Sequence, residues 1–387
     1  MKTIYDYSLE ELITYLTNLD IYPKKNHLQF SKASSTPNDS AARQQEVNEA
    51  ANNAEKKFAN KMKPFKAKQI FKRIYTKNVV AIDQISTLSK PERSLLKEKL
   101  SFPKYTYTKQ STSNTIKYLI SLEDEQCIEC VIIISKKRKT LCISSQVGCK
   151  LKCSFCATGT IGFKRNLTAG EIILQYIIAL LDNSNKTLPS KNEDTKQILI
   201  DNVVFMGMGE PLFNIRNVLK AIDILNDPKG ANIGIRKFTI STVGIIPEIN
   251  KLLESGRRLN LAISLHAATD HLRNTLVPIN KKYPVHELIK MGLKYQLITK
   301  RRVTLEYILL KDINDKEEDA KNLIKLVNHK GFHINIIPYN PTGLKYSRST
   351  RIKSFMDTLA NNGLNITLRK SEGIDISAAC GMLVAKK

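Results

Sequence analysis

The stretch GCKLKCSFCATG, residues 148–159, holds three cysteines, Cys149, Cys153 and Cys156, at the spacing C-x3-C-x2-C. It directly follows a strand-like run, TLCISSQV (140–147), which is the first of several such runs along the chain. The end of a strand of this kind is where barrel enzymes hold their reactive groups. The cysteine stretch therefore marks both the start of a repeating array and a candidate site.

Strand-like and helix-like runs alternate after these cysteines. The strand-like runs are NVVFMGMG (202–209), KFTISTVG (237–244), NLAISLHA (260–267), VTLEYILL (303–310) and HINIIPYN (333–340). The helix-like runs cover 168–182, 214–226, 246–255, 284–298, 316–329 and 349–362, and the first opens on a capping box, Thr168 with Glu171. Six β/α units predict an α/β fold with a parallel sheet covered by helices. A partial (β/α) barrel and a doubly wound sheet both fit, because periodicity does not order the strands.

Smaller parts precede this array. Residues 1–100 predict a small, basic helical domain, because helical periodicity appears at SLEELITYLTNL (8–19), with Ser8 and Glu11 as a capping box, and again after residue 64. Residues 32–60 form a polar insert with few large apolar side chains, and residues 184–196 form a polar loop. Residues 101–139 predict a β-hairpin extension, and residues 140–387 hold the array and a C-terminal loop with Cys380.

Composition narrows the class of protein. The 387 residues carry 61 Lys and Arg against 36 Asp and Glu, a formal charge of +25, which favours a polyanionic partner, nucleic acid before membrane. The N-terminus does not resemble a secretory signal, and no run of 18 apolar residues is present, so we expect no membrane partner. Seven clustered cysteines, an odd number, indicate a reducing compartment, and we expect a cytoplasmic protein.

Three thiolates on one short loop suit a [4Fe–4S] cluster in which the fourth iron stays open to another ligand. Electron-transfer clusters take four cysteines, and no fourth cysteine lies near at the expected spacing. A zinc site would also need a fourth ligand, and His266 is remote in the sequence. Three buried structural cysteines are the plain alternative. The pair Cys127 and Cys130 could form a zinc half-site, although ordinary strand residues explain it as well.

With Phe155 as its aromatic residue, C-x3-C-x-aromatic-C resembles the signature of the radical SAM superfamily. The resemblance implies one [4Fe–4S] cluster held by the three cysteines, a partial (β/α)6 barrel, and S-adenosylmethionine (SAM) on the open iron. Five strings in order, TLCISSQVGC, FMGMGEPL, ISTVGIIP, LAISLHA and DISAACG, narrow the resemblance to the RlmN family of dual-specificity adenine-C2 RNA methyltransferases. This match runs from about residue 64 to 382. The insert at 32–60, the loop at 184–196 and the absence of tryptophan depart from the usual members.

The family resemblance assigns roles to three further residues. It implies that Cys380 accepts a methyl group from one SAM and that a second SAM is cleaved to a radical, which activates the methyl group for addition to C2 of adenine. Cys142 would then attack Cys380, release the RNA and leave a disulfide. Glu129, thirteen residues before Cys142, would be the base that removes the C2 proton. The alternatives are a small core residue for Cys142 and an outward-facing strand residue for Glu129.

Family positions that contact SAM also match residues at predicted strand ends. They are Gly209, Glu210, Ser241, Ser264, Leu265, His266 and Asn340. Glycine at such a position lets the backbone approach a ligand closely. Serine and asparagine at strand ends also serve simply as caps of the next helix, so each assignment has a structural alternative.

The expected partners follow from the same resemblance. They are 23S rRNA and tRNA, with an electron donor such as flavodoxin and no DNA, and the basic segments 61–73 and 135–140 are the candidate phosphate contacts. The nearest alternative is a C8-methylating enzyme of Cfr type, against which Pro211 after Glu210 argues. A noncatalytic zinc- or cluster-containing RNA-binding protein is the alternative from another class.

Overall fold

The computed structural model describes residues 2–18, 64–77, 79–135, 138–184, 200–327 and 331–385. The chain divides into two compact units, one of Met1–Phe102 with Asp227–Asn232 and one of Pro103–Asn226 with Ile233–Lys387. The predicted polar insert at 32–60 lies outside the described residues, as does the predicted loop at 184–196 after Ser184. Within the described ranges, no helix is long and apolar enough to cross a membrane.

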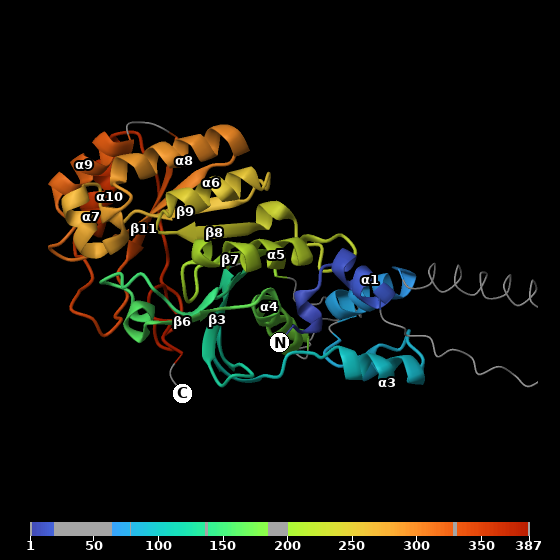
Figure 1. Cartoon of the computed structure of the whole chain (residues 1–387). Helices are drawn as coiled ribbons and strands as arrows, with labels where there is room; N and C mark the ends of the chain where they lie inside the picture. Colours follow the sequence, from blue (N-terminus) through green and yellow to red (C-terminus); the bar gives the residue numbers. More distant parts are fainter. Residues whose placement is uncertain are drawn as a thin grey trace, which may run out of the picture. The chain divides into compact units, whose positions relative to one another are not determined.

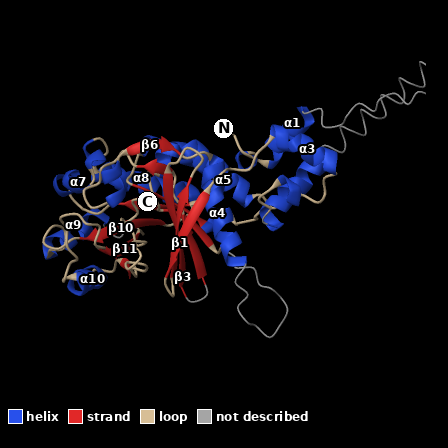
Figure 2. Ribbon diagram, turned by 90° about the horizontal axis from the view of Figure 1, so that it is seen from below, coloured by secondary structure: helices blue, strands red, loops and turns tan. Residues whose placement is uncertain are grey.

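The first unit is helical where it is described. Helix α1 spans Leu9–Asn18, residues 64–77 are helical, and α3 spans Lys90–Lys99. Figure 2 draws α1 and α3 in blue with no red strand between them. The capping box predicted at the start of α1 is confirmed: the Glu11 N–H donates to Ser8 Oγ at 3.2 Å, and the Ser8 N–H donates to Glu11 Oε2 at 2.9 Å.

The second unit is built on one ten-stranded sheet (Figure 1). Its strands in spatial order are β1 (Thr106–Ser111), β2 (Thr115–Ser121), β3 (Cys127–Ser135), β4 (Arg138–Cys142), β7 (Asn202–Phe205), β8 (Phe238–Thr242), β9 (Asn260–Ser264), β10 (Val303–Leu309), β11 (His333–Pro338) and β12 (Asn365–Leu368). Strands β1 to β4 pair antiparallel, and every pair from β4 to β12 is parallel. Each parallel strand joins on the same side in chain order, so the sheet is wound in one direction like a partial barrel, and the doubly wound alternative is wrong.

Helices cover this sheet. They are α4 (Ala169–Ser184), α5 (Ile215–Asn226), α6 (Ile246–Glu254), α7 (Asp270–Leu276), α8 (Val285–Thr299), α9 (Glu317–Val327) and α10 (Ile352–Asn361). In Figure 1, α5, α6 and α8 follow one another beside the strands in chain order. The predicted capping box of α4 is confirmed, because the Glu171 N–H donates to Thr168 Oγ1 and the Thr168 N–H donates to Glu171 Oε2.

Three local features differ from the sequence pattern. Strand β4 ends at Cys142, and the expected continuation to residue 147 instead forms β5 (Gln146–Gly148), which pairs with β6 (Phe163–Asn166) in a separate sheet. Strand β1 was not expected, because its side chains are all exposed and mostly polar. Strand β12 was not expected either, since most of its side chains are also exposed. Helix α7 is too short for its periodicity to stand out.

Candidate active site

The cysteine loop begins where β5 ends. Gly148 has φ +73°, and a Cβ there would lie 1.7 Å from the carbonyl oxygen of Gly162, so only glycine closes the base of the loop. The Cys149 N–H then donates to the same oxygen at 2.9 Å. Cys149, Cys153 and Cys156 all line one cavity of about 160 Å³. The fold thus brings the three predicted ligands together.

This cavity is named the SAM-side cavity after the ligand that the sequence resemblance implies. It is built from the carboxyl ends of successive parallel strands. Beside the cysteines it is lined by Gly209 and Glu210 after β7, Ser241 and Thr242 in β8, Ser264 and His266 at β9, Glu306 in β10, Arg369 after β12, and Cys380. Five of the predicted SAM-contact residues therefore converge here, from segments 23 or more residues apart in the chain. Two predicted residues do not line this cavity: the Leu265 side chain is fully buried in the core, and Asn340 lines a second cavity, described below.

Gly209 and Glu210 are held in place by Gln146. Gly209 has φ +94°, and a Cβ there would lie 2.5 Å from Gln146 Cβ. The Glu210 N–H donates to Gln146 Oε1 at 2.9 Å. The Glu210 carboxylate, 3 % exposed, accepts the N–H groups of Leu212 at 3.1 Å and Val243 at 3.0 Å. The loop is therefore packed tightly against Gln146, and two backbone donors hold the Glu210 carboxylate.

Burial raises the pKa of Glu210 to about 7, while the Val243 and Thr242 donors oppose that rise. Near neutral pH the carboxyl group is thus poised between its charged and neutral forms. An ammonium group entering the cavity would favour the charged form. This chemistry suits the amino group of SAM.

His266 contributes a neutral imidazole. Its Nδ1 accepts the Ile308 N–H at 3.1 Å, so its proton sits on Nε2. Burial, with the charge of Arg273, lowers the pKa of His266 to about 3. Its ring meets Phe155 edge to face with centroids 4.7 Å apart. Phe155, the aromatic residue of the cysteine motif, thereby ties the cysteine loop to the end of β9.

Arg273 on α7 is fully buried and holds two strand ends together. Its guanidinium donates to the carbonyl oxygens of Val243, Ser264 and Leu265 and to Asn280 Oδ1, at 2.7, 2.9, 2.8 and 2.8 Å. None of these partners is a carboxylate. The positive charge of Arg273 instead acts on Cys153. Burial raises the pKa of Cys153, and Arg273 partly opposes that rise. Sequence reasoning missed this residue.

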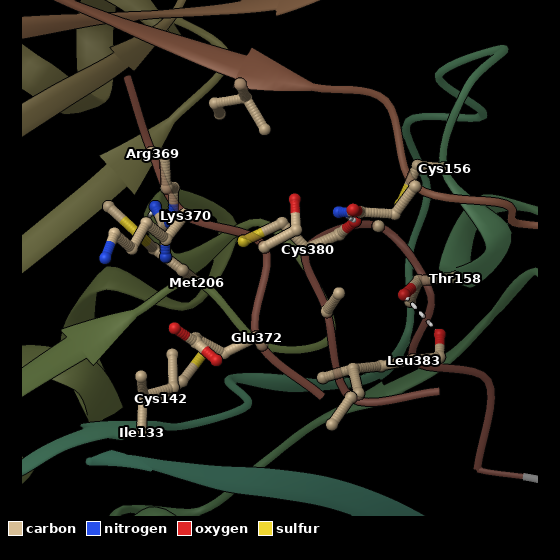
Figure 3. A pocket seen from close by; sticks show the side chains of 17 residues that line it. Ile133, Cys142, Cys156, Thr158, Met206, Arg369, Lys370, Glu372, Cys380 and Leu383 are labelled. Carbon is tan, nitrogen blue, oxygen red and sulfur yellow. Dashed lines mark hydrogen bonds between the residues drawn. The ribbon is translucent and has the colours of Figure 1, made fainter. Parts of the chain in front are cut away.

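Cys380 joins the SAM-side cavity to a second cavity of about 90 Å³ (Figure 3), here named the thiol cavity. The thiol cavity is also lined by Cys142, Met206, Asn340, Arg369 and Glu372. The two predicted catalytic thiols thus face one space, although all seven cysteines are free. In Figure 3 the sulfur of Cys380 points to the side of Met206 and Arg369, away from Cys156.

Arg369 is the cation of the thiol cavity. Its Nη1 donates to Met206 Sδ at 3.4 Å, and its own pKa is raised, chiefly by Cys380. Burial raises the pKa of Cys142 to about 12, an effect that Cys380 adds to and Arg369 opposes. The buried positive charge of Arg369 therefore partly offsets the effect of burial on Cys142. Arg369 directly follows β12, a strand that the sequence did not reveal.

Asn340 lies after β11 and is 1 % exposed. Its Nδ2 donates to the Cys380 carbonyl oxygen at 3.1 Å, but its Oδ1 is buried without a partner. A buried acceptor without a donor is costly unless a ligand satisfies it. Asn340 therefore fits a ligand with hydrogen-bond donors, as the adenine amino group of SAM has.

Glu129, the predicted base, lines neither cavity. Its carboxylate on β3 pairs with Lys117 Nζ at 3.1 Å and accepts the N–H groups of Val384 and Ala385. On the same strand, Cys127 and Cys130 are an odd number of residues apart and so face opposite sides of the sheet. These two cysteines are strand residues with no shared site.

The thiol set fits an iron–sulfur cluster. Burial raises the pKa of Cys149 to about 12 and raises that of Cys153 as well, so their charged forms need a metal or a buried cation to stabilise them. Arg273 supplies part of that charge at Cys153. In the part of the chain that is described, no three His, Cys, Asp or Glu side chains are grouped for a single metal ion. A [4Fe–4S] cluster does not need its cysteines grouped around a single ion, because each thiolate binds a different iron.

Comparisons with known proteins agree with this geometry. The family model of the radical SAM superfamily matches residues 143–324. A protein of Thermosipho melanesiensis named probable dual-specificity RNA methyltransferase RlmN is 45% identical over 331 residues, covering 84% of this chain and 94% of that protein. A protein of Thermotoga maritima with the same name is 40% identical, and its alignment covers 100% of this chain. A crystal structure of a radical SAM methyltransferase from Sphaerobacter thermophilus aligns over both whole chains with a TM-score of 0.83 and 35% identity.

Proposed function

The chain belongs to the RlmN family of radical SAM RNA methyltransferases, and from that premise we propose that it methylates C2 of adenine in RNA through Cys380. The observation that carries the proposal is the position of Cys380, which lines both the SAM-side cavity and the thiol cavity. A thiol at that junction can accept a group on one side and deliver it on the other. Nucleophilic catalysis by a thiol splits one difficult transfer into two easier steps.

Cys149, Cys153 and Cys156 would hold a [4Fe–4S] cluster, with Gly209, Glu210, Ser241, Ser264, His266 and Asn340 around SAM. When bound, the cluster supplies the electron that cleaves the sulfonium of SAM to a 5′-deoxyadenosyl radical. Glu210 would accept the amino group of SAM, consistent with its poised carboxyl group. Leu265 would contribute only through its backbone, because its side chain is in the core.

Cys380 is the methyl carrier in this proposal. Its thiolate displaces the methyl group of one SAM, which forms the S–CH₃ bond and releases S-adenosylhomocysteine. Loss of a hydrogen atom from that S-methyl group to the radical from a second SAM leaves a methylene radical, which adds to C2. Arg369 lines the same cavity as Cys380 and would place a buried positive charge beside the reacting sulfur.

Cys142 and Glu129 would complete the turnover. The adduct must first lose its C2 proton and one electron, for which the cluster left oxidised by SAM cleavage would be the acceptor. Cys142 would then attack the Cys380 sulfur. The S–CH₂ bond breaks, the carbon takes a proton to become the methyl group, and a Cys142–Cys380 disulfide remains. The shared thiol cavity supports the attack. We propose Glu129 as the group that accepts the C2 proton.

The proposed substrates are 23S rRNA and tRNA, with a flavodoxin-type electron donor. Lys68 and Lys72 are exposed one helical turn apart in residues 64–77 and would contact phosphates. Of the basic segments predicted for this role, residues 61–63 and 136–137 lie outside the described residues. The target base must leave its stack, because its C2 edge is otherwise covered.

The direct test is Cys380→Ala, assayed with methyl-labelled SAM and RNA under reducing, anaerobic conditions. We expect no methylated RNA but continued reductive cleavage of SAM, because the cluster ligands are untouched. Cys127→Ala is the matched control, since Cys127 lines neither cavity. RNA methylation at the wild-type rate by Cys380→Ala would refute the carrier role.

The site of methylation needs a separate measurement. Pro211 follows Glu210 in this chain and favours C2 over C8. Mass and fragmentation of the modified adenosine distinguish the two products. A C8-methylated product would assign the chain to the Cfr-type activity.

A further inference from the structure

The segment that follows the carrier cysteine, Gly381–Ala385, is tied down at several points. The Gly381 carbonyl oxygen accepts the Ala157 N–H at 2.8 Å, and the Leu383 carbonyl oxygen accepts Thr158 Oγ1 at 2.7 Å (Figure 3). Both donors belong to the 3₁₀ helix at Ala157–Ile161, directly after Cys156. One end of this segment is therefore anchored on the cluster loop.

The other end is anchored on Glu129. A single carboxylate oxygen, Oε2, accepts the N–H groups of Val384 at 2.8 Å and Ala385 at 3.0 Å. These contacts join residues 255 or more positions apart in the chain. Hydrogen bonds to an ionised acceptor are about twice as strong as neutral ones. The residue proposed as base is thus occupied by the segment that directly follows the proposed methyl acceptor.

Lys117 orients this carboxylate from the neighbouring strand. Lys117 and Glu129 lie diagonally across the β2–β3 pair, because Lys117 pairs with Val131 and Leu119 pairs with Glu129. The Lys117 Nζ contacts Oε1 at 3.1 Å, which leaves Oε2 for the two backbone donors. Both side chains are largely buried, 11% and 5% exposed, so neither charge is well solvated without the other.

We propose that Lys117 and Glu129 form a clamp that holds Gly381–Ala385 and so fixes Cys380 between its two cavities. In this arrangement Glu129 lines neither cavity, so the carboxylate reaches an RNA base only after the segment lets go. Lys117 is a positioning residue, which acts on Cys380 through Glu129 and the backbone. The inference rests on the proposed function, because the roles of Cys380 as methyl carrier and Glu129 as base come from it.

Amide hydrogen exchange tests the clamp without catalysis. Val384→Pro deletes one of the two donors, and Val384→Ala keeps it, so the pair is matched. We expect the Ala385 amide to exchange about ten- to a hundred-fold faster in Val384→Pro and in Lys117→Met than in wild type, as the loss of a charge-assisted hydrogen bond implies. Val384→Ala and Lys117→Arg should stay close to wild type. Lys117→Met covers the case in which the proline variant does not fold.

A second readout follows methylation of Cys380 by SAM in the absence of RNA, measured by mass spectrometry of the intact cluster-loaded protein. We expect Lys117→Met to slow it and Lys117→Arg to restore it, since the clamp sets the position of the thiol. Exchange at Ala385 that is equal in wild type, Val384→Pro and Lys117→Met would overturn the clamp. Absence of S-methylation in wild type would instead overturn the carrier role, while the exchange result would still decide the clamp.

Discussion

Replacing Gly209 by alanine tests the loop that presents Glu210 to the SAM-side cavity. Gly209 has φ +94°, and an added Cβ would meet Gln146 Cβ at 2.5 Å and Cγ at 2.7 Å. The backbone conformation alone costs about 1–2 kcal/mol for a residue with a side chain. Overpacking adds about 1–3 kcal/mol, and a displaced Gln146 gives up its bond from the Glu210 N–H, worth about 1 kcal/mol. We expect a loss of about 3–6 kcal/mol in the free energy of unfolding.

Gly256→Ala is the control for the backbone effect. Gly256 also has a positive φ, +70°, but a Cβ there meets nothing within 4 Å. Urea unfolding of the reduced, cluster-free proteins should therefore give a loss of about 1–2 kcal/mol for this variant. SAM affinity of the cluster-loaded protein should fall in Gly209→Ala alone. If the two variants lose the same stability, close packing of Gly209 on Gln146 is refuted.

Two further outcomes concern charge. Burial lowers the pKa of His266 to about 3 in the folded protein, so this residue takes up a proton more readily in the unfolded chain. The free energy of unfolding should therefore fall as pH drops from about 6.5 toward 3, by about 1.4 kcal/mol per pH unit. His266→Asn keeps an acceptor for the Ile308 N–H but does not titrate, so its unfolding free energy should approach that of wild type as the pH falls; a constant difference would contradict a buried neutral imidazole. Binding to RNA should weaken steeply with salt, and Lys68→Ala with Lys72→Ala should lower the slope of log K against log salt by about 2. An unchanged slope would remove this helix face as a phosphate contact.

The sequence predicted the architecture well where strands are buried. Runs such as NLAIS in β9 are apolar on both faces, which is typical of a parallel sheet covered by helices. It missed the two edge strands β1 and β12, because β1 is polar without alternation and β12 is only four residues long. The sequence also did not predict the order of the strands in the sheet, because periodicity is a local property and strand pairing joins residues far apart in the chain. The one-directional order from β4 to β12 decided between the two candidate folds.

By itself the sequence determined the family of this protein and which thiols are available: the spacing of Cys149, Cys153 and Cys156 and the isolated Cys380 predict a cluster loop and a distant thiol. Only the tertiary structure decided what surrounds them. It placed Arg369 beside the two thiols predicted to be catalytic, buried Arg273 near Cys153, and paired Glu129 with both Lys117 and the C-terminal segment. The physical reason is that residue type and spacing define which ligands and nucleophiles exist. Burial and long-range pairing set their charges, their partners and their access to a substrate.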